Sequence, residues 1–292
     1  MFHRTHEEGS AMPTFETPEP ITADIEIYTG QVRINASDRA DTAVEVRPSD
    51  PSAEASVQAA ERTIVEFSGG RLLVKGPRPK GLASLLSWRG FIDVIVDLPA
   101  ASRVEARGAA DFITTGSLGK TVLRSSNGDM RLEETGPLEV KTANGNISVD
   151  RVTGPAEATT SNGTIRIGTV DGTGVVKSSN GEISLGEATG DLQLKTATGD
   201  VTVGRALAGL TAKTAYGRIR IGAVVRGTVH LENGYGKVDV GIAEGTAAWL
   251  DLHSKNGVVR NALTAAEGPE TTDTVVEVRA HTNYGDIDIH RS

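Results

Sequence analysis

The sequence predicts an all-β protein, a single-chain β-solenoid with about two strands per coil of about 18 residues and one short helix in an N-terminal cap. Three observations predict this class. A glycine-centred motif recurs at nearly constant spacing, and apolar residues alternate on both sides of each glycine. The composition also suits strands and turns, with 34 Gly but only 5 Phe, 4 Tyr and 2 Trp among 292 residues. So few aromatic side chains favour a thin core of small and β-branched residues.

The motif that sets the period reads SNGDMRL, ANGNISV, SNGTIRI and SNGEISL in four consecutive copies. Its glycines are separated by 17, 18, 18, 18, 18, 19, 21 and 28 residues. An Asn-Gly pair between alternating strands also suits a hairpin, but a series of hairpins needs no constant spacing, whereas stacked coils do. We therefore expect an array of coils, aligned on Gly128, Gly145, Gly163, Gly181, Gly199, Gly217, Gly236, Gly257 and Gly285.

Each period has room for two short strands, because a second glycine follows most aligned glycines after eight to ten residues. The second and fourth residues after the aligned glycine are apolar, as in Ile165 and Ile167. The seventh and fifth residues before it are apolar or small, as in Leu192 and Leu194. Alternate residues of a strand share one face, so both sets are predicted to point inward. A three-sided coil with a short extra strand remains an alternative.

The chain divides into three parts by composition and regularity. Residues 1–20 contain no apolar run of signal-peptide length and are predicted to be a flexible tail. Residues 21–107 follow looser rules and are predicted to form an irregular β cap, which covers the open end of a solenoid. Residues 108–292 carry the regular repeats.

The cap region has its own predicted elements. An Ala- and Glu-rich stretch indicates a short helix near 51–63, with Asp50 or Ser52 as the N-cap. The segment 76–90, GPRPKGLASLLSWRG, is predicted to be a loop that folds over the core or offers an apolar contact. The expected strands lie at 24–28, 31–35, 44–47, 64–67, 72–75 and 91–98.

Three sequence features resemble the bacterial "putative adhesin" β-strand-repeat family, a domain of unknown function common in actinomycetes. They are the (S/T)-x-N-G-x-I-x-V repeats, the segment TADIEIYTGQVRI and the segment GTAAWLDLHSKNGVVRN. The resemblance spans roughly residues 20–292. It implies a β-solenoid without assigned catalytic residues.

Charge and cysteine content limit the classes of function. The formal net charge is −8, which argues against general binding to nucleic acid, and there is no Cys for disulfides or thiolate metal sites. No apolar stretch is long enough to span a membrane. The residues that follow the aligned glycines form no row of carboxylates, so neither bound calcium nor any other metal or cofactor is predicted. We expect a cytoplasmic, non-enzymatic scaffold or binding module.

One outward position carries most of the candidate binding residues. The residue four before the aligned glycine is basic in five of the first six coils, at Arg124, Lys141, Lys177, Lys195 and Lys213. Stacked coils would line these cations up at about 4.8 Å spacing. The row is interpreted either as solvated or paired with Glu139 and Glu157, or as a contact for an anionic protein or polymer.

A second candidate set lies beside the turns. Tyr216, Tyr235 and Tyr284 directly precede three of the aligned glycines. They are predicted either to shield this edge or to contact a carbohydrate or a protein.

The alternative function is a solenoid that binds or hydrolyses glycans. Asp286 and Asp288 lie two residues apart on one outward face, as paired catalytic carboxylates would. His253 and His281 share one repeat position and are expected to lie on adjacent coils.

Overall fold

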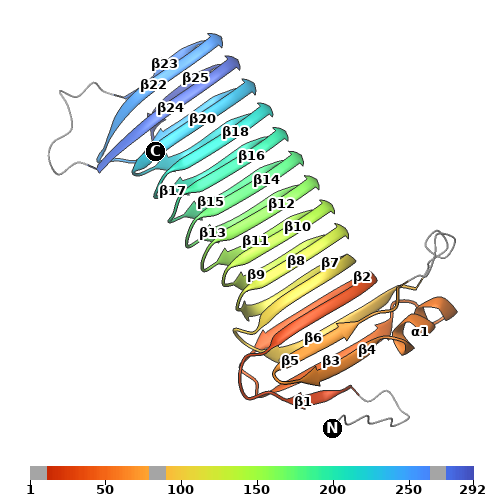
Figure 1. Ribbon diagram of the computed structural model, residues 1–292. Helices are drawn as coiled ribbons and strands as arrows, with labels where there is room; N and C mark the ends of the chain where they lie inside the picture. The colour runs from red at the N-terminus through yellow and green to blue at the C-terminus, as the bar shows by residue number, and fades with distance from the viewer. Residues whose placement is uncertain (1–11, 79–89, 264–273) are drawn as a thin grey trace.

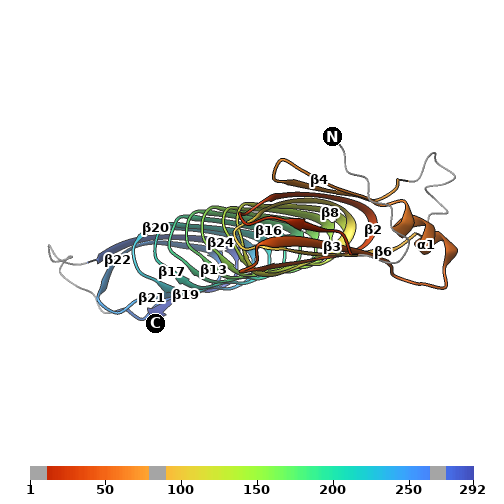
Figure 2. The ribbon, with the colours of Figure 1, turned by 90° about the horizontal axis from the view of Figure 1, so that it is seen from below.

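The computed structural model describes residues 12–78, 90–263 and 274–292. Its strands wind into an elongated stack of coils with two flattened faces (Figures 1 and 2). Each regular coil contributes one strand to each face, which confirms the predicted β-solenoid with two main strands per coil.

The first face is built from strands that each end at the residue directly before a turn glycine. They are β8 (Thr121–Asn127), β10 (Leu138–Asn144), β12 (Ala156–Asn162), β14 (Gly174–Asn180), β16 (Leu192–Thr198), β18 (Leu210–Tyr216), β20 (Gly227–Tyr235), β22 (Thr246–Asn256) and β24 (Thr274–Tyr284).

The second face is built from the strands that follow these turns. They are β9 (Met130–Thr135), β11 (Ile147–Val152), β13 (Ile165–Val170), β15 (Ile183–Ala188), β17 (Val201–Ala206), β19 (Ile219–Val224), β21 (Val238–Ile242), β23 (Val259–Asn261) and β25 (Ile287–Arg291).

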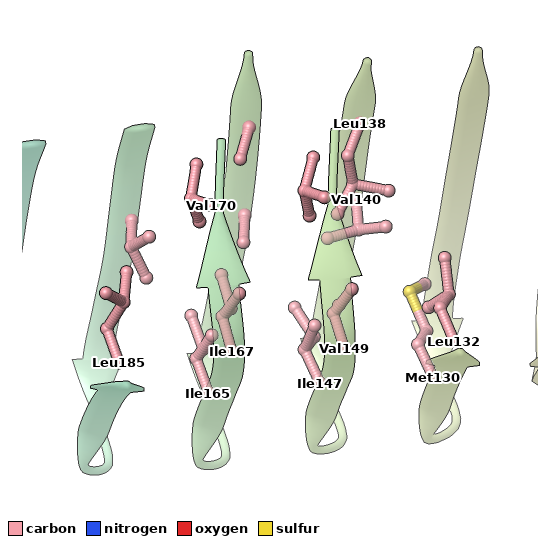
Figure 3. Packing of buried hydrophobic residues seen from close by; sticks show 14 of the residues in the cluster. Met130, Leu132, Leu138, Val140, Ile147, Val149, Ile165, Ile167, Val170 and Leu185 are labelled. Carbon is pink, nitrogen blue, oxygen red and sulfur yellow. The ribbon is translucent and has the colours of Figure 1, made fainter. Parts of the chain in front are cut away.

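The core is a set of inward rows that run from coil to coil. Parallel pairing places Ile183 between Ile165 and Val201, so equivalent apolar positions stack directly on one another. Figure 3 shows the side chains of Ile147, Ile165 and their neighbours filling the space between the faces. The predicted inward positions of both strands are buried throughout the regular coils, as the alternation requires.

A polar row lies inside the turns and joins consecutive coils. The hydroxyl three residues before a turn glycine donates to the carbonyl oxygen of the turn glycine in the previous coil. Thr196 reaches Gly181 at 3.0 Å and Thr214 reaches Gly199 at 3.0 Å. This bond gives the carbonyl oxygen of one turn a hydrogen-bond donor from the next coil.

The first two coils of the stack each consist of one long, bent strand. β2 (Thr22–Ser37) and β7 (Arg103–Leu118) pair in parallel over both faces. The two halves of β7 pair in turn with β8 and β9 of the next coil. Coil-by-coil pairing therefore starts at residue 22, inside the region 21–107 that was expected to be an irregular cap. The glycine signal is lost in β7 because Ala110 stands opposite Gly30.

Residues 38–78 and 90–102 close the N-terminal end. β5 (Arg71–Lys75) and β6 (Ile92–Pro99) pair in parallel with the two halves of β2. Antiparallel strands lie outside them, with β4 (Ile64–Ser68) on β5, β3 (Asp41–Pro48) on β6, and β1 (Thr14–Glu16) on β3. The rings of Phe15 and Phe67 stack at 5.2 Å between the two faces and cover this end of the core.

Two details of the cap differ from expectation, and a third expectation falls mostly on residues that the structure does not describe. The helix α1 (Glu54–Glu61) has Ala53 at its N-cap without a side-chain bond, because Asp50 instead accepts from the amide and hydroxyl of Ser52. Residues 14–16, expected in a flexible tail, form β1 because an edge of β3 is free to pair. Residues 79–89 of the expected apolar loop lie outside the described part of the chain.

The C-terminal coils are stacked out of chain order. β24 pairs with β20 on one side and with β22 on the other, and β25 lies between β21 and β23 in the same way. The coil of residues 274–291 thus inserts between two coils that precede it in sequence (Figure 1). The bond from Ser254 to the carbonyl oxygen of Gly285, 2.8 Å long, shows the same order inside the turn.

Candidate binding face

The predicted basic residues lie in one row on the first face, which Thr159 interrupts between Lys141 and Lys177. Each lies opposite its equivalent in the next coil, and the row also includes Arg107 of β7. We call it the basic ladder: Arg107, Arg124, Lys141, Thr159, Lys177, Lys195 and Lys213. Neighbouring members are about 4.8 Å apart along the solenoid, the spacing of adjacent strands. All of them are exposed or half-buried.

An acidic residue lies at each end of the basic ladder. Glu26 stands opposite Arg107 and contacts it at 2.6 Å, and Glu232 stands opposite Lys213 and contacts it at 2.9 Å. Hydrogen bonds from Lys213 and His230 lower the pKa of Glu232 below its usual range. The ladder is thus bounded by a carboxylate that pairs with its end member on each side.

Ion pairing inside the ladder is uneven. Arg124 contacts Glu139 at 2.5 Å, so one of the two predicted acidic partners is used. Glu157 makes no ion pair with any residue of the described ranges, and neither do Lys141, Lys177 and Lys195. These three ammonium groups form the unpaired centre of the ladder.

Uncharged residues border the C-terminal half of this centre. On one side the row beside the ladder contains Val175, Gln193 and Thr211, which stand opposite one another on consecutive strands. The row on the other side contains Ser179, Ala197 and Ala215, two positions after the lysines. Because these neighbours are uncharged, they do not offset the positive electrostatic potential of the lysines on this flat surface.

The N-terminal end of the ladder leads to a cavity of about 640 Å³. Arg78, Arg107 and Arg124 line it together with Glu26. Both Arg78 and Arg107 contact the Glu26 carboxylate, whose side chain is only 13% exposed. Sequence reasoning missed this part of the row, although Glu26 lies four residues before Gly30 as the other members lie before their glycines.

Beyond Glu232 the row continues as His281 and His253. Their rings meet edge to face at 6.2 Å, so the expected proximity of these histidines is present. Within the described ranges, no group of three or more His, Cys, Asp or Glu side chains is arranged to hold a metal ion. Nor does any helix within those ranges have the length and apolar character needed to cross a membrane.

The three predicted tyrosines form a stacked column at the turn edge of the first face. The rings of Tyr216 and Tyr235 stack at 5.0 Å, and those of Tyr235 and Tyr284 at 4.7 Å, both nearly parallel. Each face of the Tyr235 ring is therefore covered by a neighbouring tyrosine. Thr198 and Asn256 of the adjacent coils stand next to the outer faces of Tyr216 and Tyr284. The column therefore presents mainly ring edges and hydroxyls.

A double-mutant cycle should detect this stacking. Because adjacent aromatic pairs contribute about 0.5–1.5 kcal/mol, Tyr216→Ala and Tyr235→Ala should show a coupling of that size in urea unfolding. The matched control is Tyr216→Ala with Tyr284→Ala, whose rings are separated by Tyr235 and should show almost no coupling. Equal coupling in the two cycles would mean that the tyrosines act through the backbone rather than through ring contact.

The candidate catalytic carboxylates are held in an ionic network on the second face. Arg260 contacts Asp286 at 2.8 Å and Asp288 at 3.2 Å, while Lys237 contacts Asp288 at 2.6 Å. The backbone N–H of Val258 and the Arg260 side chain lower the pKa of Asp286, and Lys237 and Arg260 lower that of Asp288. Glycoside hydrolysis needs one carboxyl with a raised pKa, and neither member of this pair has one.

Comparison with known proteins bears on the whole stack. A family model described as Toastrack DUF4097 matches residues 22–292, from the first residue of β2 to the end of the chain. The chain belongs to the Toastrack family. The match begins at the coil where parallel pairing begins, and it includes the cap strands β3 to β6 as well as the repeats. No curated protein matches this Toastrack chain.

Solved structures that cover nearly all of the Toastrack chain share little sequence with it. A "putative adhesin" from Bacteroides fragilis is 10% identical, with 97% of this chain and 98% of that chain covered and a TM-score of 0.40. A "putative adhesin" from Parabacteroides distasonis is 15% identical, with 95% and 96% covered and a TM-score of 0.37. A "putative lipid binding protein" from the same species is 10% identical, with 97% and 96% covered and a TM-score of 0.29.

Proposed function

We propose that this Toastrack protein is a non-enzymatic binding module whose basic ladder holds a linear anionic polymer along the solenoid axis. The observation that supports this most directly is the unpaired centre of the ladder, Lys141, Lys177 and Lys195. Single surface ion pairs contribute little, but a polymer meets several of these charges at once. Its binding therefore depends on the number of contacts rather than on any one of them.

The spacing of the ladder defines the ligand class. Successive cations are about 4.8 Å apart where the coils carry lysine in direct succession, at Lys177, Lys195 and Lys213. A flexible chain with a negative charge on every repeat unit, such as an acidic peptide or a polyphosphodiester, can bring several of its charges to this row. The flat surface beside it suits a flexible strand better than a rigid duplex, so double-stranded nucleic acid is not the proposed partner.

The test is binding of fluorescent polyphosphate and polyglutamate to the full chain at several salt concentrations. We expect Lys141→Glu/Lys177→Glu/Lys195→Glu to weaken binding by about tenfold or more at low salt, because attraction becomes repulsion along the centre of the row. We also expect wild-type affinity to fall steeply as salt rises.

The control removes the same charge from the opposite face. Arg131, Arg166 and Arg220 are exposed on the second face, so Arg131→Glu/Arg166→Glu/Arg220→Glu gives the same net charge without touching the ladder. Equal losses in the two triple variants would contradict a specific role for the ladder. Equally tight binding of duplex DNA by the wild type would contradict the proposed ligand class.

We also propose a cytosolic location for the protein. Cell fractionation tests it. Recovery of the protein in the cytosolic fraction would support the proposal, and recovery only from the culture supernatant or the cell wall would contradict it.

A further inference from the structure

The out-of-order coil makes residues 246–261 the outermost coil at the end opposite the N-terminal cap. One edge of β22 pairs with β24 from Thr246 to Asn256. No strand in the described part of the chain pairs with the other edge. An unpaired strand of eleven residues is a template for pairing with another chain.

Within the described residues, the end of the core is only partly covered at this coil. Leu250, Leu252 and Val259 occupy inward positions, opposite Val278, Ala280 and Ile287 of the neighbouring coil. Those three neighbours are 0% exposed, whereas Val259 is 41% exposed and both leucines are only partly buried. At the N-terminal end, by contrast, Phe15 and Phe67 cover the core.

The outward side chains of β22 carry charges that are complementary when two copies of this strand pair with each other. In an antiparallel pairing of two copies of β22 about His253, Asp251 of each copy lies opposite Lys255 of the other. Both side chains are exposed. A parallel pairing in direct register would place Asp251 against Asp251 instead, and like charges directly opposite one another destabilise a sheet.

We propose that the protein forms a two-fold symmetric dimer through antiparallel pairing of β22 with β22 of a second copy. The symmetry axis is perpendicular to both faces, so β23 meets β23 of the second copy on the other face and the two cores join. Because the same edge serves in both copies and the opposite end is capped, assembly stops at two. This proposal does not depend on the polymer-binding function.

Sedimentation equilibrium of the full chain over a range of concentrations tests the dimer. The expected mass is twice the 30.5 kDa of one chain. A protein that stays monomeric at all concentrations would overturn the proposal, whatever else covers the edge of β22. Open-ended association into larger species would equally contradict the two-fold arrangement.

A charge swap tests the register. Asp251→Lys places lysine against Lys255 of the second copy and should weaken dimerisation by about tenfold or more, as Lys255→Asp should through two opposed aspartates. The combined variant restores opposite charges across the axis and should dimerise again. Dimers that survive both single changes would overturn the proposed pairing, as would a combined variant that stays as weak as the single ones. Circular dichroism of each variant checks that the solenoid remains folded.

Discussion

Replacing Gly181 by alanine is expected to destabilise the protein by about 2 to 6 kcal/mol. The residue has a φ of +148°, where a side chain adds strain of about 1–3 kcal/mol. A Cβ atom at this position would also lie 1.9 Å from the carbonyl oxygen of Gly163 in the previous coil. Two coils joined by backbone hydrogen bonds cannot separate locally, and overpacking of this kind costs about a further 1–3 kcal/mol.

Gly245 provides the matched control for Gly181→Ala. It also has a positive φ, +73°, but a Cβ atom there has no heavy atom within 4 Å beyond its chain neighbours. Gly245→Ala should therefore cost only the backbone strain, about 1–2 kcal/mol. Urea unfolding of the two variants measures the difference. Equal losses would show that close stacking of the turns adds nothing to the requirement for glycine.

Replacing Ile183 by alanine is expected to cost about 2 to 5 kcal/mol. The side chain is 1% exposed and lies between Ile165 and Val201 of the adjacent coils. The backbone ladder fixes the distance between these coils, so the surrounding residues cannot collapse into the space left by the lost methyl groups. The free energy of unfolding from urea titration gives the measurement.

Glu182→Ala tests whether position in the alternation explains the effect of Ile183→Ala. Glu182 is the preceding residue and is exposed. Its replacement should change stability by no more than about 0.5 kcal/mol. Comparable losses at the two sites would contradict the inward row that Figure 3 shows for this stack.

The repeat architecture could be predicted because the same residue pattern recurs in every coil. The period, the inward positions and the rows of lysines and tyrosines follow from an alternation of two residues and a coil of constant length. Once coils stack in register, equivalent residues become neighbours. The side-by-side arrangement of Lys177, Lys195 and Lys213 therefore needed no information beyond the sequence spacing.

The ends of the stack could not be predicted in the same way. At the C-terminal end, coils 246–261 and 274–291 carry similar inward residues, so the apolar pattern alone does not show which of them stacks on β20 and β21. The observed order brings Asp288 of β25 against Lys237 of β21, a contact that the chain order of coils would not make. At the N-terminal end, Ala110 replaces the glycine of the motif, which concealed Arg107 and the beginning of the ladder.

The inserted coil also determines when the stack can be completed during synthesis. In a solenoid, each coil gains most of its stability from its nearest neighbours. Residues 246–261 leave the ribosome before residues 274–291, yet those later residues are their only strand partners in the described part of the chain. The earlier coil must therefore wait, unpaired, until the later one has docked on β20 and β21. Folding by simple addition of coils in order of translation stops at Ile242, and the last two coils must close together as one cooperative unit.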